Sequence, residues 1–358
     1  MIYSKEFKIG SSAISNSSPT YFIADIAANH DGQLTRALDL ISRAKDAGAD
    51  CAKFQHFTAN TIVSEVGFSK KENSLSHQKK WSKSVTEIYD QFHTKAEWDQ
   101  RLLEKCREVE IDFMTTPYNT DVVDRLDQFL MAYKIGSGDI TNYQILAHVA
   151  KKEKPIFLAT GAADAKDVKA AMKIILEKNP DICLMQCNTN YTGSLENFKY
   201  VNLNVIKSFA LMYPGLPLGL SDHTPGHTTV LGAVSLGARV IEKHFTDDCS
   251  RVGPDHSFAM DSDTWKGMVD ATRELEYALG DGIKRIEANE IETVIIQRRG
   301  CRLISNKENG DVITPRDVDF LRPCEENAIS PIDLFRLKSI QLNKKLSAGE
   351  SIKWGDVE

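Results

Sequence analysis

The sequence predicts a (β/α)8 barrel followed by a small β-rich domain. Two observations carry this prediction: apolar, β-rich runs alternate eight times with helical patterns, and polar side chains follow each run at the same end. Eight such units in about 260 residues match the usual size of this barrel. A doubly wound open sheet is the alternative architecture for the same alternation.

The predicted strands are short, and several are apolar on both faces, as in a parallel sheet covered by helices. They span residues 21–27, 50–55, 111–115, 131–135, 155–159, 182–186, 216–220 and 240–245. Helical patterns span residues 34–47, 95–109, 121–129, 143–152, 165–177, 203–211, 228–236 and 262–279.

The alternation stops after residue 282. We therefore expect a barrel over residues 1–282, a charged linker over 283–293 and a β-rich domain over 294–358. About 60 residues is marginal for an independently stable unit, so this domain is expected to pack against another surface.

Composition restricts the class of partner. The formal net charge is -6, which gives no general attraction to nucleic acid or to an anionic membrane. Residues 1–20 are polar and lack a signal-peptide core, and no stretch approaches ~20 apolar residues. We expect a cytoplasmic protein that acts on small molecules.

Two lysines, Lys53 and Lys134, lie within apolar strands. A buried lysine is costly unless an anion accompanies it, so a phosphate or carboxylate site is expected. The hydroxyl donors predicted for this cradle are Thr116, Ser137, Thr160 and Ser221. The alternative is a pair of lysines whose stems pack while their heads reach solvent.

His223 and His244 end neighbouring predicted strands. Two imidazoles that share one ion leave positions open for water and substrate, as in a catalytic metal site. Few histidines among oxygen ligands favour Mn²⁺ or Mg²⁺. Glu242 and Asp255 are candidate further ligands or bases, and one histidine is alternatively a core residue or a general base.

Residues 58–93 form a long polar stretch between the second strand and its helix. Loops longer than ~12–15 residues are uncommon unless they are lids or lack order. Trp81 and Tyr89 favour a lid over the substrate; a surface insertion is the alternative.

Eight motifs along the chain resemble those of a known family. The motifs are ADIAANHDG (24–32), AKDAGADCAKFQ (44–55), TTPY (115–118), YKIGSGDI (133–140), GLSDHT (219–224), IEKHFT (241–246), GPDH (253–256) and LRPCEENAISP (321–331). In this order they resemble the sialic acid synthases, which join phosphoenolpyruvate to amino sugars. The resemblance extends over about 340 residues and includes an antifreeze-like (SAF) C-terminal domain.

The resemblance implies roles residue by residue. The phosphoenolpyruvate contacts would be Lys53, Thr116, Lys134, Ser137 and Ser221, with Thr160 and Asn188 beside them. The metal ligands would be His223 and His244, and the catalytic set would be Asp25, Lys134, His223, Glu242 and His244. The sugar contacts would be Gln55, Asp139, Asn190, Tyr191, Asp255 and Arg322. The last of these would reach the barrel of a partner subunit, which implies a domain-swapped homodimer.

Departures from the family pattern lie on the sugar side. The family usually has Glu at the positions of Asp25 and Asp139, and the stretches around Asn188–Asn190 and Cys324–Asn327 also differ. The acceptor therefore stays open among N-acetylmannosamine, a diacetamido-trideoxyhexose and a phosphorylated sugar.

Three other functions remain alternatives. One is a barrel aldolase with Lys134 or Lys243 as a Schiff-base nucleophile. A second is a condensing enzyme that makes a seven- or eight-carbon keto acid, which would lack the C-terminal domain and Arg322. The third is a non-catalytic carbohydrate-binding barrel.

Overall fold

The computed structural model describes residues 2–69 and 83–358. The chain divides into two compact units, Met1–Gly280 and Asp281–Glu358. Each unit has its own apolar core, and each is described here by itself.

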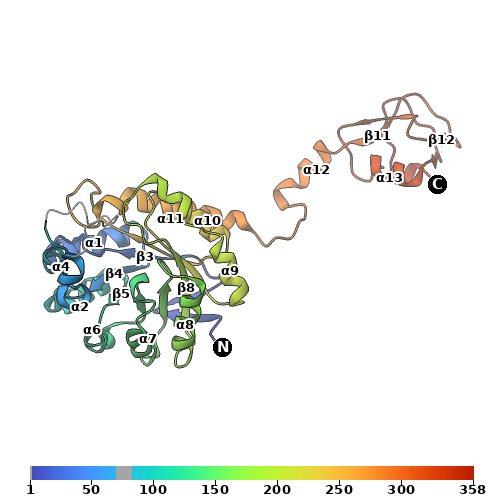
Figure 1. Cartoon of the computed structure of the whole chain (residues 1–358). Helices are drawn as coiled ribbons and strands as arrows, with labels where there is room; N and C mark the ends of the chain where they lie inside the picture. The colour runs from blue at the N-terminus through green and yellow to red at the C-terminus, as the bar shows by residue number, and fades with distance from the viewer. Residues whose placement is uncertain (1, 70–82) are drawn as a thin grey trace. The chain divides into compact units, whose positions relative to one another are not determined.

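Within the described residues, eight parallel strands of the first unit close into a barrel, because β10 pairs with β3 (Figure 1). The strands are β3 (Tyr21–Asp25), β4 (Cys51–His56), β5 (Asp112–Pro117), β6 (Tyr133–Ile135), β7 (Ile156–Ala159), β8 (Ile182–Cys187), β9 (Leu218–Asp222) and β10 (Val240–His244). The predicted barrel is thus confirmed, and the open sheet is excluded.

A helix follows each strand around the outside of the barrel (Figure 1). These helices are α1 (Leu34–Asp46), α5 (Asp99–Glu108), α6 (Thr120–Leu126), α7 (Tyr143–Ala150), α8 (Ala165–Leu176), α9 (Val205–Met212), α10 (Thr228–Ser235) and α11 (Ser262–Leu279). In α1 the buried residues Ala37, Leu40, Ile41 and Ala44 follow the helical period, so one face packs on the strands.

Side chains along each strand alternate between two environments, as the period of two requires. In β4, Ala52 and Phe54 join the large core beneath the helices, whereas Cys51 belongs to the core inside the barrel. Inside-facing positions near the strand starts are apolar, and the later ones carry the polar residues described below.

A hairpin that the sequence analysis did not predict precedes the barrel. Strands β1 (Glu6–Ile9) and β2 (Ser12–Ser15) pair antiparallel, and Phe7, Ile9 and Ile14 pack into the core inside the barrel. The polar N-terminus therefore closes the barrel at the end where its strands begin.

The long stretch after β4 contains helices α2 (Ala59–Ile62), α3 (Glu65–Ser69) and α4 (Val85–Phe92). Ser84 and Glu87 form a capping box that begins α4. Tyr89 lies on α4, whereas Trp81 lies outside the described residues. The lid function stays a prediction.

The second unit is rich in short strands, as expected. It contains α12 (Ile291–Gln297), β11 (Gly300–Leu303), β12 (Val312–Ile313), β13 (Val318–Leu321), α13 (Pro331–Leu337) and β14 (Ile340–Gln341). The two units divide after Gly280, and α12 begins within the stretch expected to be a linker. Among the described helices, none combines the length and the apolar character that crossing a membrane requires.

Candidate active site

The polar strand ends meet in one pocket at the mouth of the barrel, here called the inner pocket. Its lining residues are Asp25, Lys53, Gln55, Thr116, Tyr118, Lys134, Gly136, Ser137, Ala159, Cys187, Tyr191, Ser221, His223, Glu242 and His244. They come from or closely follow all eight barrel strands, since parallel strands end at the same face of a barrel.

Two lysines and two carboxylates form the charged floor of the inner pocket. The Lys53 ammonium lies 2.7 Å from Asp25 Oδ2 and 3.9 Å from Glu242 Oε2. Lys134 lies 3.2 Å from Glu242 Oε1. All four side chains are buried, so these ion pairs are weakly screened by water.

Burial and ion pairing shift the pKa values of Asp25 and Lys53 in opposite directions. Burial raises the pKa of Asp25, but Lys53 and His244 lower it more, and the carboxyl titrates below its usual range. Burial lowers the pKa of Lys53, but Asp25 and Glu242 outweigh it, and the ammonium titrates above its usual range. The Lys53–Asp25 pair is therefore ionised at neutral pH.

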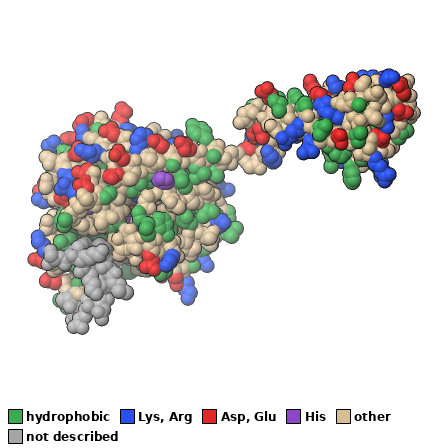
Figure 2. Space-filling model, turned by 90° about the horizontal axis from the view of Figure 1, so that it is seen from above, with side chains coloured by type: hydrophobic (Ala, Val, Ile, Leu, Met, Phe, Trp, Pro, Cys, Tyr) green, Lys and Arg blue, Asp and Glu red, His purple; other side chains and the backbone are tan. Residues whose placement is uncertain are grey.

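The positive charge of Lys53 and Lys134 is a local feature of the inner pocket. Figure 2 shows Lys and Arg side chains interspersed with Asp and Glu on the visible face of the barrel unit. With a net charge of -6, the overall field of the chain does not favour anions, so the positive charge available to an anion in this pocket is that of Lys53 and Lys134.

Hydroxyl groups complete the predicted cradle, with one exception. Thr116 Oγ1 accepts from Lys53, Ser221 donates to Glu242 Oε1 at 3.0 Å, and Ser137 Oγ accepts from the Gly161 amide. Thr160 lies outside the lining because its hydroxyl donates to the Met185 carbonyl.

His223 and His244 face one another, with ring centroids 5.4 Å apart. His223 Nδ1 lies 3.0 Å from the Asn188 carbonyl, which orients the ring. His244 Nδ1 is buried without a hydrogen-bond partner among the described residues. Burial lowers the pKa of His244 to about 3, so its imidazole is neutral, the form that binds metals.

This donor set fits a divalent cation that keeps open positions, because two imidazole nitrogens converge beside buried carboxylates. Within residues 2–69 and 83–358, no group of three or more His, Cys, Asp and Glu side chains is arranged to hold a metal. The protein would therefore supply few ligands, with water or substrate completing the shell.

Asp222 and Lys243, which directly precede His223 and His244 in the sequence, form a second buried ion pair. Lys243 lies 2.5 Å from Asp222 Oδ2 and donates to the Thr224 carbonyl, and Thr224 and Thr229 also donate to Asp222. Lys243 therefore holds the loop that carries His223. It does not line the inner pocket, which removes it as a candidate Schiff-base nucleophile.

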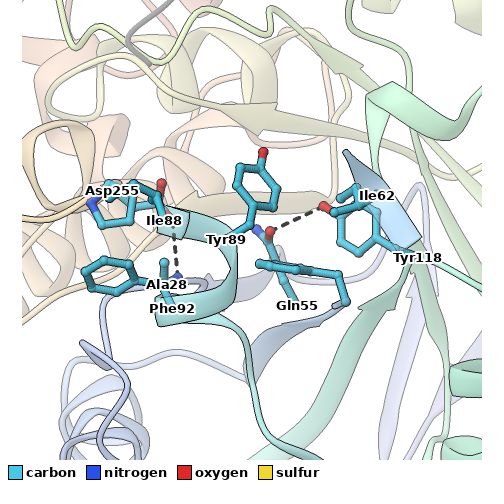
Figure 3. A pocket seen from close by; sticks show the side chains of 10 residues that line it. Ala28, Gln55, Ile62, Ile88, Tyr89, Phe92, Tyr118 and Asp255 are labelled. Atoms are coloured by element: carbon cyan, nitrogen blue, oxygen red, sulfur yellow. Dashed lines mark hydrogen bonds between the residues drawn. The ribbon is translucent and has the colours of Figure 1, made fainter. Parts of the chain in front are cut away.

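A second pocket adjoins the inner one and is here called the outer pocket (Figure 3). It is lined by Ala28, Gln55, Phe57, Ile62, Ile88, Tyr89, Phe92, Tyr118, Pro254 and Asp255. Gln55 and Tyr118 line both pockets. Ile62 comes from α2, and Ile88, Tyr89 and Phe92 come from α4.

Of the residues predicted to contact the sugar, some line the two pockets and others do not. Gln55 lines both pockets, Tyr191 lines the inner pocket and Asp255 lines the outer pocket. Asp139 lines neither pocket and accepts from Asn142 at its own helical turn.

The two asparagines predicted near the substrates do not line either pocket. The Asn188 side chain donates to the Tyr200 carbonyl, and exposed Asn190 accepts from Thr192 and Asn197. Arg322 belongs to the second unit and is exposed.

Sequence reasoning missed several lining residues. Cys187 lies at the inward-facing end of β8; burial raises the pKa of its thiol, but the neighbouring His223 and Ser137 outweigh burial and bring the pKa below its ordinary value. Tyr118 donates to Gln55 at 3.3 Å. Both follow from the strand alternation, since each lies at or just past a strand end, but the apolar walls from α2 and α4 gave no local signal.

Comparison with known proteins decides the family. The NeuB family model matches residues 40–284, more than half of the chain. The chain belongs to the NeuB family.

Relatives in this family cover almost the whole chain. The N,N'-diacetyllegionaminic acid synthase of Legionella pneumophila is 34% identical over 94% of this chain and 94% of its own length. A pseudaminic acid synthase of Campylobacter jejuni is 32% identical over 94% of this chain and 96% of its own length. The human N-acetylneuraminate-9-phosphate synthase is 30% identical over 89% and 87%.

A solved structure of a relative agrees with the fold. The N-acetylneuraminic acid synthetase of Leptospira borgpetersenii, in complex with citrate, superimposes with a TM-score of 0.70 at 27% identity. The match covers 82% of this chain and 96% of that protein. The NeuB family members named above are synthases of related acidic sugars, so membership favours an enzyme over a carbohydrate-binding barrel.

Proposed function

We propose that this chain is a nonulosonate synthase. It condenses phosphoenolpyruvate with an open-chain N-acylamino sugar, N-acetylmannosamine or a diacetamido-trideoxyhexose, and releases phosphate by C–O cleavage. The observation that carries the proposal is the inner pocket, where two buried lysines with hydroxyl neighbours lie beside a pair of facing histidines. The names of the NeuB relatives support the same reaction class.

Lys53 and Lys134 bind the phosphate and carboxylate of phosphoenolpyruvate. Both ammonium groups are held by carboxylates, so the substrate competes with Asp25 and Glu242 for them. Thr116, Ser137 and Ser221 supply hydroxyl donors around the same anion, and bound anions are stabilised most where water is excluded.

The carbon chemistry follows from the charges. C3 of phosphoenolpyruvate attacks the aldehyde carbon and forms the new C–C bond, which leaves positive charge at C2. The carboxylates of Asp25 and Glu242 stabilise that charge. Water adds at C2, and the bond between C2 and the phosphate-bridging oxygen breaks, which gives the 2-keto acid and inorganic phosphate.

His223 and His244 would hold Mn²⁺ or Mg²⁺. When bound, the cation supplies Lewis-acid polarisation of the aldehyde oxygen. Exhaustive chelation is expected to abolish phosphate release, and added Mn²⁺ or Mg²⁺ is expected to restore it. Activity that persists through complete chelation would overturn the metal assignment.

The second part of the proposal concerns subunits. Arg322 of the small domain contacts the N-acyl group of the sugar in a partner's barrel, within a domain-swapped homodimer. The resemblance of the LRPCEENAISP stretch to the family's antifreeze-like domain supports this arrangement.

The reaction is tested by phosphate release from phosphoenolpyruvate with Mn²⁺ against a panel of acylamino sugars. With ¹⁸O in the bridging position of phosphoenolpyruvate, the label is expected in the released phosphate, since the C–O bond breaks. Label retained in the keto acid would contradict C–O cleavage. Inactivation by borohydride only when a carbonyl substrate is present would instead favour Lys134 as a Schiff-base nucleophile.

A further inference from the structure

One carboxylate outside both pockets joins the loop after β3 to the loop after β10. We propose that Asp31 is a positioning residue, which acts through His256 to fix the Asp255 carboxylate beside the histidine pair. The inference rests on the proposed function and deepens it, because the position of Asp255 is read out in the condensation.

The Asp31 carboxylate binds three cationic or ring side chains. His256 Nε2 donates to its Oδ1 atom at 2.9 Å, and Arg251 Nη2 donates to its Oδ2 atom at 2.8 Å. Arg36 Nε, from α1, lies 3.2 Å from the same Oδ2 atom. Arg251 and His256 both belong to the loop after β10, so these contacts, here called the Asp31 clamp, hold the two loops together.

His256 transmits the clamp to the site. Asp31 itself lines neither the inner nor the outer pocket. His256 directly follows Asp255 in the chain and is fully buried. Its ring is held at both nitrogens, at Nε2 by Asp31 and at Nδ1 by Thr246 Oγ1, 2.8 Å away. A ring fixed in this way also fixes the backbone of the residue before it.

Asp255 lies where the clamped loop reaches the site. Its Oδ2 atom accepts from the Ala28 amide at 3.1 Å (Figure 3) and lies 3.9 Å from His244 Nδ1. Ala28 belongs to the same loop as Asp31. Release of His256 would therefore allow the Asp255 carboxylate to move away from both contacts, and a misplacement of about 1 Å can lower a rate about 100-fold.

Asp31→Asn breaks the clamp with little other change. Asp31 has a φ of 53°, in the left-handed region that Asn and Asp adopt more readily than other residues with a side chain. The carboxamide has nearly the same size but carries a donor on one side. That donor faces either the two arginines or His256 Nε2, so one half of the clamp is lost without a cavity.

Steady-state phosphate release measures the effect, with phosphoenolpyruvate, Mn²⁺ and the acylamino sugar that the wild type uses best. Asp31→Asn is expected to lower kcat/KM for the sugar about 10- to 100-fold. KM for phosphoenolpyruvate is expected to stay within about twofold, because the two lysines of the inner pocket lie outside the clamp.

A second variant and a control accompany Asp31→Asn. His256→Phe keeps an aromatic ring that donates no hydrogen bond, and it is expected to reproduce the loss. Asp39→Asn, on α1, removes a carboxylate that forms an exposed pair with Arg43, and it should retain full activity. Circular dichroism checks the fold of each variant.

A double-mutant cycle distinguishes positioning from a general loss of folded protein. If Asp31 acts through Asp255, Asp31→Asn is expected to cost less than about threefold in an Asp255→Asn background. A general loss of folded protein would lower activity by the same factor in both backgrounds, and that result would overturn the inference.

The crystal structure of Asp31→Asn provides a readout that needs no activity. The hydrogen bond between Asp255 and the Ala28 amide is expected to be lost, whereas Lys53 and Lys134 keep their ion pairs. An Asp255 carboxylate still bonded to Ala28 would overturn the inference.

The outcomes separate this inference from the proposed function. An active wild type with unchanged kcat/KM in Asp31→Asn would overturn the inference alone. No phosphate release by the wild type with any acylamino sugar would overturn the proposed function and this inference together.

Discussion

At the scale of single residues, Lys134 shows how tightly charge is balanced in the inner pocket. Its ammonium pairs with Glu242, which also lies near Lys53 and accepts from Ser221. Breaking one side of a buried pair is costly because the other charge is left without compensation. Removing the Lys134 ammonium would also remove its proposed contact with the substrate anion.

Lys134→Ala is therefore expected to lower kcat/KM for phosphoenolpyruvate by roughly 100- to 5,000-fold, which corresponds to about 3–5 kcal/mol. Steady-state phosphate release measures the loss. Lys166→Ala, at an exposed position of α8, is the control and should retain full activity. Full activity in a folded Lys134→Ala variant would contradict the role of the anion cradle.

His30 provides a pH prediction away from the histidine pair. The ring is buried, and its Nδ1 atom accepts from the Gly32 amide, which requires the unprotonated form. Burial lowers its pKa to about 3 in the folded chain. The unfolded chain, with the ordinary value near 6.5, binds this proton first, so stability falls as pH falls from about 6.5 toward 3.

His30→Gln should reduce that slope of unfolding free energy by about 1.4 kcal/mol per pH unit, the value for one proton. Urea unfolding of both proteins at pH 7 and pH 5 measures it. His93 is only partly buried, and His93→Gln serves as the comparison. Parallel pH dependence of the wild type and His30→Gln would contradict the assignment.

Much of the inner pocket could be predicted from the sequence because strands alternate. Lys53 and Gln55, or Glu242 and His244, are two residues apart on one strand and therefore face the same side. The same alternation explains why Thr160 and Asn188 do not line the pocket, because each directly follows an inward-facing residue, Ala159 or Cys187, and so faces the other way. Their partners, the carbonyl groups of Met185 and Tyr200, come from other segments and are revealed only by the folded chain.

At the scale of elements, the β1–β2 hairpin is the clearest addition by the structure. Its exposure alternates, with Phe7 and Ile9 buried and Glu6 and Lys8 exposed. A run of four residues is too short for a period of two to be distinguished from chance. The assignment depends on the apolar opening of the barrel, which is a tertiary feature.

Ile9→Ala should lower the free energy of unfolding by about 2–5 kcal/mol, because it leaves a cavity inside the barrel. Ile9 is only 1% exposed. Urea denaturation followed by tryptophan fluorescence measures the change, and Lys8→Ala is expected to stay within about 0.5 kcal/mol of the wild type. Equal midpoints for the two variants would show that the hairpin does not contribute to the core.

Helices α2, α3 and α4 were also beyond the sequence analysis. The capping residues of α4 are visible in the sequence, but the polar character of residues 58–93 favours a loop. Ile88 and Phe92 are four residues apart and share one face of α4, but two helical turns within a polar stretch are a weak signal. Their common role as lining of one pocket appears only in the folded chain.

At the scale of the whole molecule, the second unit has its own core of Cys301, Leu303, Ile329, Leu334 and neighbouring side chains. It also exposes large apolar side chains, including Phe335 at 75% and Ile332 at 57%. Apolar side chains on α13 agree with the expectation that this small domain packs against another surface. The domain-swapped homodimer stays a prediction.

A heterodimer tests whether Arg322 acts across subunits. One subunit carries Arg322→Ala and the other Lys134→Ala, and two different tags allow the mixed dimer to be purified. If Arg322 serves the partner's barrel, one of the two sites is intact, and about half of the wild-type phosphate release is expected. The two parent homodimers, with Arg322→Ala or Lys134→Ala in both subunits, should each be nearly inactive. An inactive heterodimer would show that Arg322 serves its own barrel, and a fully active Arg322→Ala homodimer would show that it serves neither.

The origin of the outer-pocket wall has an evolutionary consequence. The residues from α2 and α4 lie in one stretch of the chain, and its described residues contribute none of the lining of the inner pocket. The wall of the outer pocket is thus encoded separately from the charged inner pocket. Exchange of α2 and α4 during evolution can therefore reshape the outer pocket while every residue that lines the inner pocket is inherited unchanged.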